Sequence, residues 1–256
     1  MARNARIISI MNQKGGVGKT ATTLCLGDIL SGMGKKVLII DLDQQMNTTS
    51  SLGLKQDYGS SFDLITGKNK NIVQKLNKMD AIRGDLNLAH YEDEAKKTKN
   101  PFNLLAFSLE PLKKDYDFII IDTPPALGVT TMNALVAANG VVIVSQAMEY
   151  SIEGVKRLFE TIVELEKRIG RRIPITGVLI TMLETNPTPV LDKQMIGHLK
   201  EMCENLGYQL FPGCIRKNIS IRESQLLKQG IAEYAPKSAG AKDYLAFAEE
   251  LLRRVK

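Results

Sequence analysis

The sequence predicts an α/β fold with a twisted, mostly parallel sheet and helices on both of its faces. Short β-branched runs alternate along the chain with longer stretches of helical periodicity, which is typical of βα units. Runs such as VLIID, FIIID and VVIVS are apolar on both faces, as expected for strands that helices cover on both sides. The 256 residues contain no repeat and no low-complexity linker, so we expect a single domain over residues 1–256.

The expected elements follow these patterns in chain order. The strands are the short apolar runs Arg6–Met11, Lys36–Asp41, Leu86–His90, Asp117–Asp122, Gly140–Ser145, Ile175–Met182 and Gln209–Ile215. The helices are the longer periodic stretches Lys19–Met33, Phe102–Lys113, Thr130–Ala138, Ile152–Ile169, Val190–Leu206 and Ala239–Arg254. The segment Thr66–Asn100 is polar and lysine-rich, and we interpret it as a surface excursion rather than a partner-binding region. A first strand at about residue 6 leaves no room for an N-terminal helix-turn-helix domain.

The composition narrows the class of protein. Apolar residues make up 44% of the chain and charged residues 24%, which argues against disorder. The net charge of +6 permits a polyanionic partner but fits a mildly basic enzyme equally well. Because Trp is absent and Phe and Tyr are few, base stacking is a poor basis for nucleic-acid binding. No apolar run approaches the roughly 20 residues of a membrane span, and the three cysteines form no CxxC motif, so we expect a cytoplasmic protein with reduced thiols.

The strongest motif is IISIMNQKGGVGKTATT, in which an apolar strand leads through a glycine-rich loop into a helix. The glycines let backbone N–H groups converge on phosphate oxygens, and the helix N-terminus adds further donors. Lys19 can reach the β- and γ-phosphates, and the Thr20 hydroxyl can ligate Mg²⁺. We therefore expect ATP and Mg²⁺ as cofactors, with nucleotide contacts from Lys14, Gly15, Gly16, Val17, Gly18, Lys19, Thr20 and Ala21. A glycine-rich turn without a ligand is the alternative.

Two later strands end in aspartate. Ligands of open α/β sheets bind beside the carboxyl ends of the strands, where both aspartates lie. Asp41 closes VLIID, with Asp43 two residues on, and is placed to orient water near the γ-phosphate or to support the Mg²⁺ shell. Alternatively, Asp41 only caps the following turn. Asp122 follows four apolar residues and is expected to hold Mg²⁺ through a water or the Thr20 hydroxyl. Its alternative is a simple turn aspartate.

These motifs, in this order, resemble the ParA/MinD branch of P-loop NTPases from residue 6 to the C-terminus. Gln13 replaces the first glycine of the ordinary phosphate loop, and the result is the KGGVGKT form of that branch. The family pattern D-x-D-P-Q-G-N is kept at Asp41, Asp43, Gln45 and Asn47, with Gln44 and Met46 as departures. The stretches GVLITM and IAEYAPKSAGAKDYLAFAEELL also resemble ParA and Soj proteins, the latter in Pro236, Ser238 and Gly240.

The resemblance implies an ATPase that dimerises around ATP. Lys14 would reach across the interface to the partner subunit's phosphates and, with Lys19 and Asp41, form the catalytic group. It implies metal ligation by Thr20, Asp41 and Asp122, and a base pocket near Met182, Arg216 and Asn218. It further implies non-specific binding of double-stranded DNA by the ATP dimer, a ParB-like partner that stimulates slow hydrolysis, and a nucleoid location. The candidate DNA contacts are Arg216, Lys217, Arg222 and Lys228.

Other functions remain open at this point. The cations of the last third can equally form a solvated basic face. The final helix is amphipathic, as a MinD-like membrane-positioning ATPase would require, but Asp243, Glu249 and Glu250 favour core packing and make a membrane partner the weaker expectation. An ATP-dependent regulatory scaffold, in which hydrolysis is incidental, is the third possibility.

Overall fold

The computed structural model describes residues 4–68, 71–95, 97–185 and 188–255. In this part of the chain, one eight-stranded sheet has the strand order β3-β4-β2-β5-β1-β6-β7-β8. All neighbours are parallel except β3 and β4. The strands are β1 (Arg6–Met11), β2 (Val37–Asp41), β3 (Gln74–Lys75), β4 (Asp80–Ile82), β5 (Phe118–Asp122), β6 (Gly140–Ser145), β7 (Ile175–Leu183) and β8 (Leu210–Arg216).

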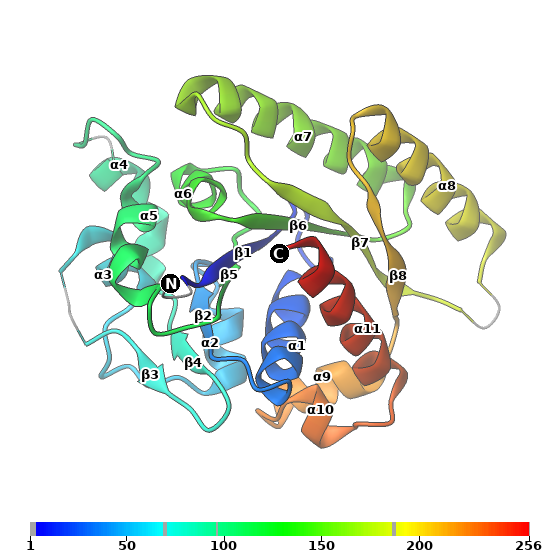
Figure 1. Cartoon of the computed structure of the whole chain (residues 1–256), viewed down its shortest axis with the longest axis horizontal. Coiled ribbons are helices and arrows are strands. Elements are labelled where there is room, and N and C mark those ends of the chain that lie inside the picture. Colours follow the sequence, from blue (N-terminus) through cyan, green and yellow to red (C-terminus); the bar gives the residue numbers. More distant parts are fainter. Residues whose placement is uncertain (1–3, 69–70, 96, 186–187, 256) are drawn as a thin grey trace.

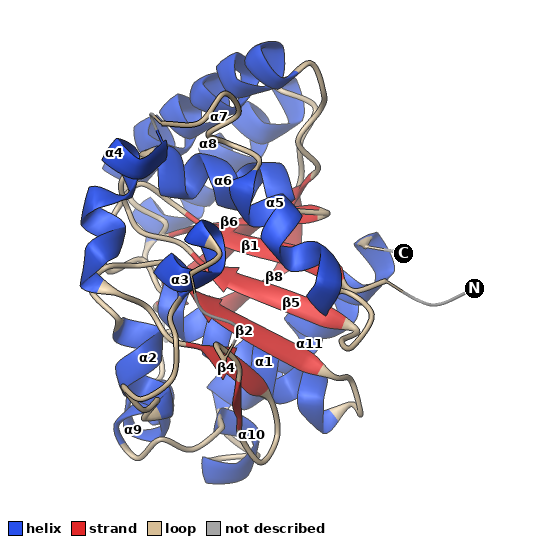
Figure 2. Ribbon diagram, turned by 90° about the vertical axis from the view of Figure 1, so that its left-hand side faces the viewer, coloured by secondary structure: helices blue, strands red, loops and turns tan. Residues whose placement is uncertain are grey.

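Helices cover both faces of the sheet (Figure 1, Figure 2). They are α1 (Lys19–Gly32), α2 (Asn47–Leu52), α3 (Ser61–Thr66), α4 (Tyr91–Ala95), α5 (Leu104–Leu109), α6 (Val129–Ala137), α7 (Glu149–Ile169), α8 (Val190–Asn205), α9 (Ile219–Leu226), α10 (Ile231–Tyr234) and α11 (Ala239–Arg254), with 3₁₀ turns η1 (Leu86–His90) and η2 (Glu110–Leu112). The predicted α/β class with helices on both faces is confirmed.

Alternate residues of the central strands supply two separate cores. Ile8, Ile39 and Ile120 belong to the core that contains residues of α1 and α11. Ile7, Leu38 and Ile119 face the other way, into the core under α3 to α6. Because both faces are buried, β2 and β5 are apolar at every position except the final aspartate, and this explains why their sequences predicted them within one residue.

The prediction of a strand at Leu86–His90 is wrong, because these residues form η1. The Asp85 side chain accepts a hydrogen bond from the backbone N–H of Asn87 and so begins a turn, and Leu86 is 67% exposed. The strand that pairs with β2 on the side away from β5 is instead the shorter β4, Asp80–Ile82. The segment Thr66–Asn100, read from the sequence as an excursion, therefore contributes both β3 and β4 to the sheet edge; residues 69, 70 and 96 lie outside the described part.

The predicted helix Phe102–Lys113 is also interrupted, since α5 ends at Leu109 and the following turn is the 3₁₀ helix with Pro111 near its start. The C-terminal helix α11 buries Tyr244, Phe247 and Leu251 against α1 and β8, which confirms the expectation of core packing. None of the described helices combines the length and apolar character of a membrane span.

Candidate functional site

The loop between β1 and α1 has the geometry of an anion cradle. Gly16 has a φ of 75° and Gly18, the N-cap of α1, a φ of 94°, and side-chain-bearing residues rarely adopt these values. A Cβ at Gly15 or Gly16 would meet no atom within 4 Å, so the space over the loop is open. The first turn of α1 has no acidic residue and no side-chain cap. Its backbone N–H groups are therefore available to phosphate oxygens.

The two lysines of the loop differ in their surroundings. Lys19 is buried, and its ammonium donates to the backbone oxygen of Lys14 at 3.2 Å. Burial lowers the pKa of Lys19, an effect that Asp122 and Asp43 oppose. The Lys14 side chain is exposed and lies with its Nζ 3.9 Å from the Met148 sulfur at the start of α7. The Lys19 ammonium thus lies against its own loop. The Lys14 side chain instead extends to the exposed surface beside Met148, which we call the rim of the site.

Asp122 lies at the carboxyl end of β5 with its side chain fully buried. Its Oδ2 accepts hydrogen bonds from Thr20 Oγ1 at 2.8 Å and from Thr48 Oγ1 at 2.7 Å. Its Oδ1 is buried without a hydrogen-bond partner among the described residues. A carboxylate oxygen left in this state is the group that a cation or a cation-bound water would satisfy.

Asp41 lies directly beside Asp122 in the register of β2 and β5. Its Oδ1 accepts from the backbone N–H of Asp43 at 3.1 Å, and its Oδ2 accepts from the N–H and the hydroxyl of Thr49 at 2.8 and 2.6 Å. Asp41 therefore caps the turn and the start of α2, which is the alternative role that the sequence allows for it. It also stands at the strand ends beside the phosphate loop, so the two interpretations are compatible.

The two neighbouring carboxylates make the site suited to a divalent cation. Burial raises the pKa of Asp41, and burial together with the charge of Asp41 raises the pKa of Asp122. Hard carboxylate and hydroxyl oxygens are the ligands that Mg²⁺ prefers. Thr20 and Asp122 are therefore the side chains that fit Mg²⁺ here, with Asp41 behind them.

The residues expected near the base lie at or just after the carboxyl ends of β7 and β8. Met182 has a φ of 56° and lies against the loop, with its methyl carbon 3.6 Å from the position of a Cβ at Gly18. Arg216, at the end of β8, forms a two-pronged ion pair with Asp243 of α11. Asn218 caps α9 by accepting a hydrogen bond from the Ser220 N–H. Met182 thus lies against the loop, and Arg216 is the register partner of Leu183, the next residue of β7. The contact of these residues with a base stays a prediction.

The four candidate DNA residues also differ. Arg216 is paired with Asp243, as described above. Lys217 is paired with Glu184 at 2.7 Å on the exposed surface. Arg222 is exposed on α9 and has no ion-pair or hydrogen-bond partner within the described ranges. Lys228 follows α9 and lies over Gly53 at the end of α2. Arg222 is thus the candidate that is most accessible to a phosphate.

Several residues of the site were not predicted from the sequence. Thr48 and Thr49 hold the two aspartates, and Gly84 donates its N–H to Thr49 Oγ1 at 2.7 Å. Thr181 fixes the loop by donating to the Val17 oxygen at 2.6 Å. The NTTS run after the Asp41 strand was an available signal, because hydroxyls at a helix start next to a strand-end carboxylate can serve it as donors.

Comparison with known proteins gives a consistent result. A family model described as an AAA domain matches residues 5–175. The sporulation initiation inhibitor protein Soj of Bacillus subtilis is 36% identical over 252 residues, covering 96% of this chain and 98% of Soj. An ATP complex of Cyanothece McdA superposes with a TM-score of 0.87 at 24% identity, over 98% of this chain and 97% of McdA, and supports the fold alone. Cobyrinic acid a,c-diamide synthase of Mycobacterium smegmatis, with bound ADP and magnesium, gives a TM-score of 0.82 at 27% identity, over 97% of this chain and 94% of that chain.

Proposed function

The chain belongs to the ParA/Soj family of P-loop ATPases, and on this premise we propose that it is an ATP-driven switch for DNA partitioning. In this proposal, Mg²⁺-ATP holds two copies of the chain together and the dimer binds duplex DNA without sequence preference. A ParB-like partner then stimulates hydrolysis, and the copies separate and leave the DNA. The protein would accordingly be found on the nucleoid.

Nucleotide binding is supported by the loop and the two strand-end carboxylates, which meet at the carboxyl ends of the central strands. Lys19 and the N-terminal N–H groups of α1 would hold the phosphates, while Thr20 and Asp122 would hold the metal. When bound, Mg²⁺ would neutralise charge on the phosphate oxygens. Asp41 is held in one orientation by Thr49 and Asp43, and we assign it the role of orienting the attacking water.

The proposal of a dimer rests mainly on the direction of the Lys14 side chain. Its backbone belongs to the loop, but its ammonium lies at the exposed rim beside Met148. Around this rim Met148, Tyr150 and Met182 are 50%, 83% and 42% exposed. Large apolar side chains gathered at a binding site favour covering by a partner surface. A second copy placed there would receive Lys14 at its own phosphates, as an arginine finger is received in other P-loop enzymes.

For DNA we propose Arg222 as the principal contact, with Lys217 as a second. An exposed ion pair such as Lys217–Glu184 is strongly screened by solvent, so a phosphate can compete for the lysine. Arg216 is better explained as the residue that ties β8 to α11. Contacts of this kind are insensitive to base sequence and sensitive to salt, and two copies double their number.

The test is binding of a fluorescent duplex, measured by anisotropy with a non-hydrolysable ATP analogue, with ADP and without nucleotide. We expect tight binding only with the ATP analogue. Arg222→Gln should weaken it and lower the slope of log affinity against log salt by about 1 for each copy's contact. Arg157→Gln, on the exposed face of α7, is the matched control and should leave the slope unchanged. Equal binding in all three nucleotide states would exclude the switch.

A further inference from the structure

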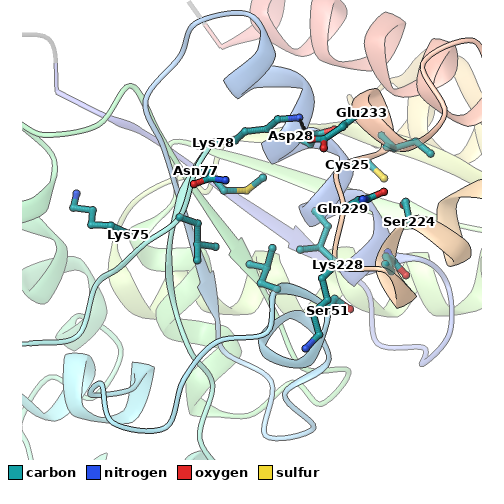
Figure 3. Close-up of a pocket in the computed structure, with 17 residues that line it drawn as sticks. Cys25, Asp28, Ser51, Lys75, Asn77, Lys78, Ser224, Lys228, Gln229 and Glu233 are labelled. Carbon is teal, nitrogen blue, oxygen red and sulfur yellow. Dashed lines mark hydrogen bonds and ion pairs between the residues drawn. The ribbon is translucent and has the colours of Figure 1, made fainter.

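A cavity of about 460 Å³ lies between α1, α2, the β3–β4 turn and the α9–α10 turn (Figure 3). No residue of the phosphate loop lines it, so it is separate from the proposed nucleotide site. Its volume is within the range of small-molecule sites, roughly 300–1,000 Å³. Much of its wall is apolar and comes from Leu24, Leu52, Met79 and Ile231.

Polar groups without partners also face this cavity. The Gln225 side-chain nitrogen is shielded from solvent and has no hydrogen-bond partner in the described part of the chain. The side chains of Ser51, Asn77 and Gln229 line the same space from three different segments, and no described residue bonds to them. The unpaired side chains of Ser51, Asn77 and Gln229 make the cavity suited to a ligand that supplies acceptor oxygens.

The charges are arranged unevenly around the cavity. At one end, Lys78 points to Asp28 and Glu233, with its Nζ 3.4 and 2.8 Å from their oxygens, so the cation there is paired with two carboxylates and is not available to an anion (Figure 3). Lys228 and Ser51 lie at the opposite end (Figure 3). No carboxylate of the described residues lies within ion-pair distance of the Lys228 ammonium. One end of the cavity therefore presents an unneutralised cation.

The backbone of Lys228 adds a separate argument. Its φ of 55° places it in the left-handed region, just after α9, where glycine is the unstrained choice. The turn is closed by bonds from the Lys228 N–H to the Gln225 oxygen and from the Gln229 N–H to the Ser224 oxygen. A lysine held in this conformation places its ammonium over Gly53, at the C-terminus of α2. Strain of this kind is a common mark of a binding position.

We propose that this cavity binds a small amphipathic anion, a carboxylate or phosphate monoester on an apolar body. The anionic head would lie on Lys228 with the Gln229 amide, and the apolar body on Leu52, Met79 and Ile231. Because α2 carries Thr48 and Thr49 on the aspartates and Ser51 and Leu52 on the cavity, the bound anion contacts the helix that holds the metal site. Binding itself does not depend on the proposed partition function.

The chain has no Trp, so Leu76→Trp, in the β3–β4 turn that lines the cavity, gives a single fluorophore. We would titrate octanoate, octyl phosphate and, as the uncharged control, 1-octanol. The expected result is a saturable fluorescence change with one of the two anions, at least about tenfold tighter than with 1-octanol. Whichever anion binds tighter identifies the head group. Isothermal titration of the unmodified chain repeats the measurement without the reporter.

Lys228→Gly is the decisive variant, because glycine relieves the left-handed strain and the fold should persist, as circular dichroism would verify. We expect this variant to weaken anion binding by about tenfold. Lys242→Gln, an exposed lysine of α11, is the control that should bind normally. The proposal is overturned if neither anion saturates the unmodified chain, if 1-octanol binds as tightly, or if Lys228→Gly binds like Lys242→Gln.

Discussion

Thr48 and Thr49 are neighbours at the start of α2, yet each donates its hydroxyl to a different buried carboxylate. Thr48 bonds to Asp122 and Thr49 to Asp41. The carboxylates themselves could be predicted, because an aspartate after a buried strand stands out in an apolar run. The threonines are harder to predict, since α2 is only six residues long, its apolar periodicity is too short to recognise, and only the run of hydroxyls in NTTS marks them.

Thr49→Val tests this arrangement because it keeps the shape of the side chain and removes the hydroxyl. The Gly84 N–H loses its acceptor and Asp41 loses a donor. We expect a loss of about 1–3 kcal/mol in the free energy of unfolding by urea. We also expect slower phosphate release with ATP affinity retained. Thr161→Val, whose hydroxyl bonds to the Arg157 oxygen on the exposed helix α7, is the control. Equal stability of the two variants would contradict the assignment.

At the scale of the elements, six strands (β1, β2, β5, β6, β7 and β8) were predicted within a residue, whereas the sheet edge formed by β3 and β4 was not. The edge pair has only two and three residues in its strands, which is too short for an alternating pattern. The junction of α1 with α10 was equally invisible in the sequence. Asp28 of α1 is buried, accepts from the Ala232 N–H at 2.8 Å and pairs with Lys78.

Gly230→Ala tests how closely α10 approaches α1. A Cβ at Gly230 would overlap the Asp28 carboxylate, so the turn before α10 would have to move. Overpacking of this kind should lower the free energy of unfolding by about 1–3 kcal/mol. Gly154→Ala is the matched control, since Gly154 lies within α7 and its Cβ would meet no atom within 4 Å. That variant should gain about 0.5–1 kcal/mol, measured in the same urea titrations. A Gly230→Ala variant as stable as Gly154→Ala would contradict the described contact.

At the scale of the whole molecule, the sheet brings the phosphate loop, Asp41 and Asp122 together from segments up to about 100 residues apart, as the strand-end rule predicts. The base and DNA contacts stay predictions, because the surroundings of those side chains depend on tertiary contacts. Arg216 is engaged by Asp243, which lies in the distant helix α11, and no local pattern reveals such a pairing. The positions of the strand-end carboxylates thus follow from backbone geometry, whereas the engagement of Arg216 depends on a tertiary ion pair.

Metal and nucleotide should stabilise the molecule as one ligand. At about 100 times the dissociation constant, ATP with Mg²⁺ should add about 2.7 kcal/mol to stability, seen as a rise in the thermal midpoint. Chelation of Mg²⁺ with EDTA should remove much of that rise. Asp122→Asn should keep the EDTA-resistant part and lose the Mg²⁺-dependent part, because the free Asp122 oxygen is the group that the metal would satisfy. A Mg²⁺-dependent rise that survives Asp122→Asn would place the metal elsewhere.

The most direct test is the molar mass in solution, measured by light scattering with a saturating non-hydrolysable ATP analogue and Mg²⁺. The proposal predicts twice the 28.3 kDa of one chain, a single-chain mass with ADP, and a single-chain mass for Lys14→Ala even when it has bound the analogue. A single-chain mass for the unaltered protein with the analogue bound, or full dimerisation of Lys14→Ala, would contradict it.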